Sequence, residues 1–276
     1  MSKVNRTLVA LAVGVLAAAT HISANHSWGG YHWARTTSQF TLKLGDNLTS
    51  ADWKSHLGQA SSDWNSGNTP ILTAIVGGQS NKRCSMVAGT TQVCNGTYGR
   101  NGWLGLASIN ITRGTHITQG SAKMNDTYFN TATYNNTNER EHVMCQEVAH
   151  TFGLDHQSTD GSSQNSCMDY FSNTGANAGS TLSTRPNAHD FQELGIIYQH
   201  LDSTSTVAAM AAMQASHGVD ISDDANSWGQ LMRQSNSGRS SEYHRFNSDR
   251  SMTVTHVYWS LEAAAACPSC DHRYDR

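Results

Sequence analysis

The sequence predicts an α/β (α+β) domain in which helices cover a twisted, mixed sheet. Residues Phe40–Leu44 alternate between apolar and polar, and Ile71–Val76 form a short apolar run ended by two glycines, so both segments are predicted as strands. Between them, one apolar face recurs at helical spacing and carries Trp53, Leu57, Ala60 and Trp64. Thr49 or Ser50 is the expected N-cap of this helix.

Further elements follow in the same order along the chain. Residues 84–101 are polar and contain glycine, so we expect a loop, whereas 103–111 and 120–129 have strand character. A helix is expected over residues 138–152. A second helix begins near Pro186 and has one apolar face formed by Phe191, Leu194, Ile197, Tyr198 and Leu201.

The segment from Cys145 to His156 carries the strongest chemical pattern. Gln146 and His150 are four residues apart, so on a helix they project from one face, about 40° apart around the axis. His156 joins them only if the chain turns, and Gly153 lies where such a turn is needed. Three neutral ligands with Glu147 beside them form the arrangement of a catalytic zinc (Zn²⁺) site.

These residues resemble the metzincin metallopeptidases, which carry His-Glu-x-x-His-x-x-Gly-x-x-His followed by a methionine turn. The match comprises Glu147, His150, Gly153 and His156, and residues 166–170 around Met168 resemble the methionine turn. The resemblance implies a metzincin-like fold with an active-site helix, a methionine turn and a closing C-terminal helix. It covers a catalytic domain of residues 25–202.

The resemblance also implies an activity, which is hydrolysis of peptide bonds by zinc-activated water with Glu147 as general base. Tyr170 lies two residues after Met168, where astacin-like members carry a tyrosine that stabilises the oxyanion. A packed tyrosine is the alternative role. By resemblance to the matrixin branch, an antiparallel edge strand binds an extended peptide or protein substrate through Leu104, Gly105, Leu106 and Ala107. An ordinary internal strand is the alternative.

Gln146 departs from the family pattern, because it replaces the first zinc-binding histidine. A glutamine oxygen is a weak zinc donor, so two hypotheses remain. The chain is a working zinc endopeptidase with a glutamine ligand, or it is a metal-free metzincin scaffold that binds peptides or proteins without cleaving them. Asp155 is an alternative ligand, whereas His142 lies a helical turn away and is expected to pack.

The N-terminus and the composition predict a secreted protein. Basic residues precede an apolar run of about 12 residues, shorter than the roughly 20 that span a bilayer, so residues 1–24 are predicted as a signal peptide rather than a membrane anchor. A net charge of -3 and a charged fraction of 14% give no electrostatic case for binding nucleic acid or an anionic membrane.

Secretion permits disulfides, and the six cysteines fall into three local pairs. Cys84 with Cys94, Cys145 with Cys167, and Cys267 with Cys270 are the candidate disulfides, although 15 pairings are open. A zinc site of four cysteines or a redox role for the last pair is the alternative. Residues 203–276 are predicted as a small accessory segment without chemistry, containing a hairpin of residues 242–246 and 252–259.

Overall fold

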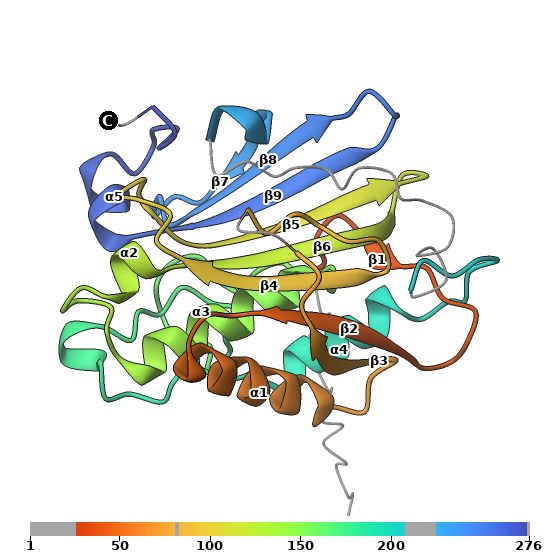
Figure 1. Ribbon diagram of the computed structural model, residues 1–276. Helices are drawn as coiled ribbons and strands as arrows, with labels where there is room; N and C mark the ends of the chain where they lie inside the picture. Colours follow the sequence, from red (N-terminus) through yellow and green to blue (C-terminus); the bar gives the residue numbers. More distant parts are fainter. Residues whose placement is uncertain (1–25, 81–82, 208–224, 275–276) are drawn as a thin grey trace, which may run out of the picture.

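The computed structural model describes residues 26–80, 83–207 and 225–274 (Figure 1). The predicted signal peptide lies outside this part of the chain. Within the described ranges, no helix combines the length and apolar character needed to cross a membrane. The helices are α1 (Ala51–Asn65), α2 (Asp126–Phe129), α3 (Thr137–His150), α4 (Ala188–Ile197) and α5 (Leu261–Ala266), with 3₁₀ turns at Gly175–Asn177 and Ala225–Trp228.

One mixed sheet of nine strands organises the described residues. Its order is β3-β2-β4-β6-β5-β9-β8-β7, and β1 pairs with β6. The strands from β3 to β6 pair in parallel, and the remaining pairs in this order are antiparallel. Figure 1 shows α1 and α3 on one face of the sheet. The strands are β1 (His32–Trp33), β2 (Phe40–Asn47), β3 (Ile71–Gly77), β4 (Thr90–Gly96), β5 (Trp103–Thr112), β6 (His116–Asn125), β7 (Gln230–Gln234), β8 (Ser240–Phe246) and β9 (Met252–Trp259).

Helix α1 confirms the amphipathic pattern. The side chain of Ser50 caps its N-terminus by accepting a hydrogen bond from the backbone N–H of Trp53 at 3.2 Å. Trp53 and Trp64 are buried in the main core, which also contains apolar residues of β2 and α3. These tryptophans therefore hold the helix layer against the sheet.

Strand β4 lies inside the segment that the sequence predicts as a loop, so that prediction is wrong for residues 90–96. Its side chains are mostly polar yet buried, because β4 is paired on both sides. Two of these side chains find partners in neighbouring segments. Gln92 accepts from Asn47 of β2 at 2.9 Å, and Asn95 accepts from the backbone N–H of Thr49, between β2 and α1, at 2.8 Å. Strand β6 also ends earlier than predicted, since Asn125 caps the helical turn α2.

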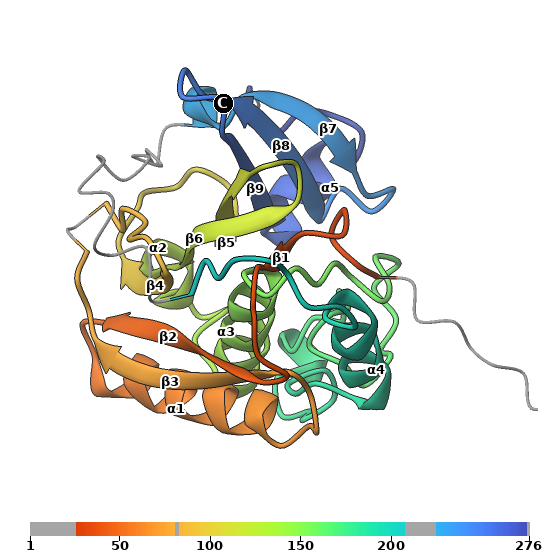
Figure 2. The same ribbon diagram turned by 90° about the vertical axis from the view of Figure 1, so that its right-hand side faces the viewer.

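The C-terminal hairpin forms as predicted, but its place in the fold was not foreseen. Strand β9 pairs antiparallel with β5 from Trp103 to Ile111, and β8 and β7 continue the same sheet (Figure 2). The prediction that β5 is an edge strand is therefore wrong for this conformation. Leu104 to Ala107 already have a neighbouring strand on each side, β6 and β9.

All three local cysteine pairs are disulfides in the structure: Cys84–Cys94, Cys145–Cys167 and Cys267–Cys270. The second joins α3 to the turn that contains Met168. The third closes a short loop after α5. The described part of the chain contains no free cysteine.

Gly153 makes the turn that the motif requires. Its φ is +96°, in the left-handed region, and a Cβ at this position would lie 1.9 Å from the backbone oxygen of Tyr31. The approach is close because the N-terminal segment packs here, where Trp28 donates a backbone hydrogen bond to the Gly153 carbonyl at 2.7 Å. Only glycine satisfies both conditions.

We expect Gly153→Ala to lower the free energy of unfolding by about 3 kcal/mol or more, since strain and a backbone clash act together. Gly99→Ala is a matched control, because Gly99 has a φ of +95° and no atom within 4 Å of the added methyl group. The control should lose only about 1–2 kcal/mol. Urea unfolding of both variants measures the difference, and equal losses would show that the contact with Tyr31 is unimportant.

Candidate metal centre

Helix α3 places the first part of the motif in the interior. It begins after Asn136, whose side chain accepts from the backbone N–H of Glu139 at 2.9 Å, and every residue from Glu139 to His150 is buried. After the turn at Gly153 the chain reverses and brings His156 back beside His150. The two Nε2 atoms are 3.0 Å apart, and the ring centroids are 4.6 Å apart.

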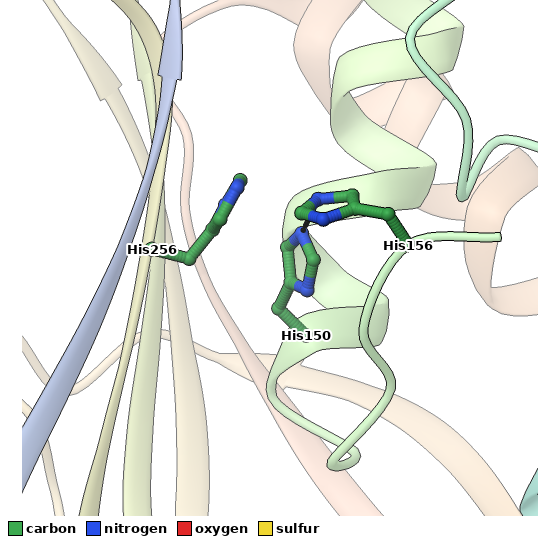
Figure 3. A group of neighbouring side chains, drawn as sticks. All are labelled: His150, His156 and His256. Carbon is green, nitrogen blue, oxygen red and sulfur yellow. Dashed lines mark hydrogen bonds between the residues drawn. The ribbon is translucent and has the colours of Figure 1, made fainter. Parts of the chain in front are cut away.

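A third imidazole comes from a distant part of the sequence. His256 lies on β9, opposite Ala107 of β5, and its ring centroid is 4.0 Å from that of His150 and 4.6 Å from that of His156. One ring nitrogen from each of the three histidines lies within 4.8 Å of the other two. Figure 3 shows the three side chains pointing toward one another from the end of α3, the loop after it and β9.

His256 is absent from the site residues that the sequence predicts, because no chemistry is predicted for residues 203–276. In its local sequence, His256 is only a polar residue on a strand. It lies on the same face as Val254 and Tyr258, which are both buried. The pairing of β9 with β5 brings it to the motif, and no local pattern encodes that pairing.

Hydrogen bonding fixes the ring nitrogens that face the centre. The Nδ1 atom of His150 donates to the Leu154 carbonyl at 2.8 Å, and Nδ1 of His156 lies 2.9 Å from the Asp155 carboxylate. When both rings are neutral, both Nε2 atoms are therefore lone-pair acceptors, and they face each other at 3.0 Å. Two facing acceptors repel, whereas a cation bound between them turns the same geometry into ligation.

Burial also favours the neutral, metal-binding form of two of the three rings. It lowers the pKa of His150 well below its ordinary value, and the neighbouring His156 lowers it further. Burial likewise lowers the pKa of His256, with His150 and His156 adding to the effect. Neutral imidazole is the form that ligates metals, so this donor set fits zinc.

Gln146 is held by the turn beneath the motif. Its Nε2 atom donates to the backbone carbonyls of Cys167 and Asp169, both at 2.8 Å. Because both partners are acceptors, the orientation of the amide is determined. The Oε1 atom is buried and has no hydrogen-bond partner among the described residues, which leaves it available to a cation.

Glu147 is fully buried, and neither carboxylate oxygen has a hydrogen-bond partner within the described ranges. Its Oε2 atom lies 3.5 Å from Nδ1 of His256. Burial raises the pKa of Glu147 well above its ordinary value. Gly105 on β5 provides the room for this carboxylate, since a Cβ there would lie 2.4 Å from Oε1.

Tyr170 and Met168 both lie close to the motif in the fold. The Tyr170 hydroxyl is 2.8 Å from Nε2 of His256, and its ring lies 4.7 Å from that of His156. Burial raises its pKa well above the ordinary value for tyrosine. Met168 is fully buried in the main core, where its backbone carbonyl accepts from the N–H of Gln157 at 2.7 Å.

Two other candidate ligands have different partners. Asp155 faces His156 and forms an ion pair with Arg233 of β7, which also pairs with Glu242. Burial alone raises the pKa of Asp155, but the bond with His156 and the charge of Arg233 hold it below its usual range. Asp155 thus orients His156. His142 lies 3.1 Å from Asn173 Oδ1 and 3.0 Å from the Asp169 carbonyl, which confirms that it packs by hydrogen bonding.

The centre is closed in this conformation. Glu147, His150, Tyr170 and His256 each expose at most 3% of their surface. The cover is β9, and a second apolar cluster seals it from the opposite face of the sheet. The cluster comprises Met86, Trp103, Leu106, Trp228, Tyr243, Val257 and Trp259.

Neither a protein-family model nor a curated protein matches this chain. Among solved structures, it is similar to high choriolytic enzyme 1, a hatching enzyme zinc-protease from medaka (Oryzias latipes), with 12% identity and a TM-score of 0.34. That match covers 61% of this chain and 94% of the other. Myroilysin is matched with 13% identity and a TM-score of 0.33, over 62% and 80% of the two chains. Similarity at this level carries no inference about the chain.

Proposed function

We propose that the chain is a secreted zinc-dependent endopeptidase of the metzincin type, in a conformation that its own C-terminal hairpin closes. The convergence of His150, His156 and His256 beside the carboxylate of Glu147, which has no hydrogen-bond partner among the described residues, supports this proposal. His256 supplies the imidazole that Gln146 lacks. The three disulfides are in keeping with an oxidising, extracellular location.

In the closed conformation the metal would be held by His150, His156 and His256. With β9 displaced, it would be held by His150, His156 and Gln146 Oε1. When bound, zinc polarises the scissile carbonyl and lowers the pKa of water. Glu147 accepts the proton of the attacking water at a carboxylate oxygen and delivers it to the leaving amine. The Tyr170 hydroxyl donates a hydrogen bond to the developing oxyanion once it separates from His256.

Peptide binding requires β9 to leave β5. An extended substrate adds to a free strand edge through backbone hydrogen bonds, and β9 occupies that position along β5 in antiparallel orientation. With β9 displaced, Leu104, Gly105, Leu106 and Ala107 form the substrate-binding edge that the sequence predicts. The closed conformation is therefore the latent form of the enzyme.

A charge placed beneath the hairpin tests the proposal. Val257 is fully buried in the second apolar cluster, so Val257→Asp raises the free energy of the docked hairpin by about 3 kcal/mol. That cost raises the open fraction about 100-fold. At saturating zinc, we expect the rate of chelator-sensitive casein cleavage to rise with the open fraction. The apolar control Val257→Ala should raise this rate much less.

The second candidate is a closed zinc-binding protein without turnover. The burial of Trp103, Leu106 and Trp259 in one sealed cluster favours it, because this much apolar contact suits a permanent interface. Stoichiometric zinc with no cleavage by either the wild type or Val257→Asp would establish this candidate and overturn the peptidase. Circular dichroism of each variant verifies that the rest of the fold is intact.

A further inference from the structure

A second group of metal-ligating side chains lies away from the motif. His32 begins β1, His116 begins β6, and the parallel pairing of these strands places the two residues opposite each other. His200 and Asp202 follow helix α4 and reach the same place. Three segments that are distant in sequence thus contribute three imidazoles and one carboxylate.

All three Nε2 atoms converge on one carboxylate oxygen. Asp202 Oδ1 lies 3.5 Å from the Nε2 atom of His32, 3.2 Å from that of His116 and 3.5 Å from that of His200. The Nε2 atoms of His32 and His200 are 3.3 Å apart. Zinc bonds of about 2.0–2.1 Å in a tetrahedron place neighbouring ligand atoms about 3.3 Å apart. These four of the six separations match that edge length, and the ligand atoms of His32, His116 and Asp202 all lie within 4.8 Å of one another.

Hydrogen bonds to the atoms that would not contact a metal hold His32 and Asp202 in place, as is usual for metal ligands. Nδ1 of His32 lies 2.9 Å from the Gly30 carbonyl and must donate to it, so a neutral His32 presents a lone pair on Nε2 toward Asp202. The other oxygen of Asp202 accepts from the backbone N–H of Arg35 at 3.0 Å. The Gly30 carbonyl and the Arg35 amide thus fix the orientation of the His32 ring and of the Asp202 carboxylate.

Without a cation, a neutral His32 has an unfavourable contact, because the lone pair on its Nε2 faces the Asp202 carboxylate. A single oxygen also cannot accept well from three rings at once. A bound zinc ion removes the conflict, since all four atoms then donate electron pairs to one centre. His200 exposes half of its side chain, which gives an ion in solution access to the group.

We infer that His32, His116, His200 and Asp202 form a second zinc site with a structural role. It ties the N-terminal segment and the segment after α4 to the turn between β5 and β6. The site shares no residue with the centre at His150, so it stands whether or not the chain is a peptidase. Four protein ligands complete a tetrahedral ion and leave no open position for chemistry.

The test is zinc content of the purified full chain after dialysis against buffered zinc. The wild type should hold two equivalents, and His116→Ala and His200→Ala should each hold one, with zinc-dependent protection against thermal unfolding reduced in both. His189→Ala is the matched control and should retain two, because His189 stacks on His26 outside both groups. His200 is half exposed, so its loss alone should leave the fold intact.

Removal of the other centre separates this inference from the proposed function. His150→Ala should also hold one equivalent, and adding His200→Ala to it should leave none. If His116→Ala and His200→Ala bind as much zinc as the wild type, the four residues are a hydrogen-bonded cluster and the inference is overturned. Two equivalents without any peptide cleavage would support the second site while rejecting the peptidase.

Discussion

Glu147→Gln, introduced into the Val257→Asp background, is expected to lower kcat/KM for a fluorogenic peptide by about 10²- to 10⁴-fold, the usual contribution of a general base. Glutamine keeps the volume of the side chain but cannot take up the proton of the attacking water. Among the described residues, Glu147 is the only carboxylate that forms an ion-pair contact with His256. No neighbouring carboxylate is therefore placed to act as the base instead.

Zinc content is the control for this variant. Glu147 is outside the three-histidine ligand set, so Glu147→Gln should bind as much zinc as its parent with an unchanged unfolding midpoint. A loss of cleavage together with zinc would assign Glu147 to metal retention. Full cleavage by the variant would remove it from the mechanism.

His256→Ala is expected to weaken zinc binding at the motif by at least about 100-fold. Removing a group that only orients a ligand already costs about 10- to 100-fold, and loss of a ligand costs more. Competition with a chromogenic chelator measures the zinc affinity. The measurement is made in the His200→Ala background, so that only the zinc bound at the motif contributes.

His244→Ala is the matched control, because His244 lies on β8 of the same hairpin and pairs with Glu242 instead of the centre. It should leave zinc affinity unchanged. If His256→Ala also leaves it unchanged, then His150, His156 and Gln146 Oε1 hold the ion by themselves, and the hairpin merely covers the site.

The parts of the fold that sequence predicts well are those encoded by local pattern. The apolar spacing of α1, the glycine turn at Gly153 and the alternation of β8 and β9 each depend on neighbours within a few residues. Strand β4 escaped prediction because its buried positions are polar, and the hydrogen-bond partners of these side chains lie in segments distant in sequence.

The candidate centre was predictable in part for the same reason. His150, Glu147 and His156 lie within ten residues, so their spacing carries the geometry, whereas His256 depends on a strand pairing that spans most of the chain. The same pairing decides that β5 is covered. The group around Asp202 is also nonlocal, since none of its four residues stands in a recognisable metal-binding motif.

Anomalous diffraction at the zinc edge from crystals of the full chain grown with zinc tests the central claim most directly. The account predicts a zinc peak about 2.0–2.1 Å from nitrogens of His150, His156 and His256. A peak ligated by His150, His156 and Gln146, with His256 turned away, would contradict it, as would a zinc-saturated crystal with no metal at the motif.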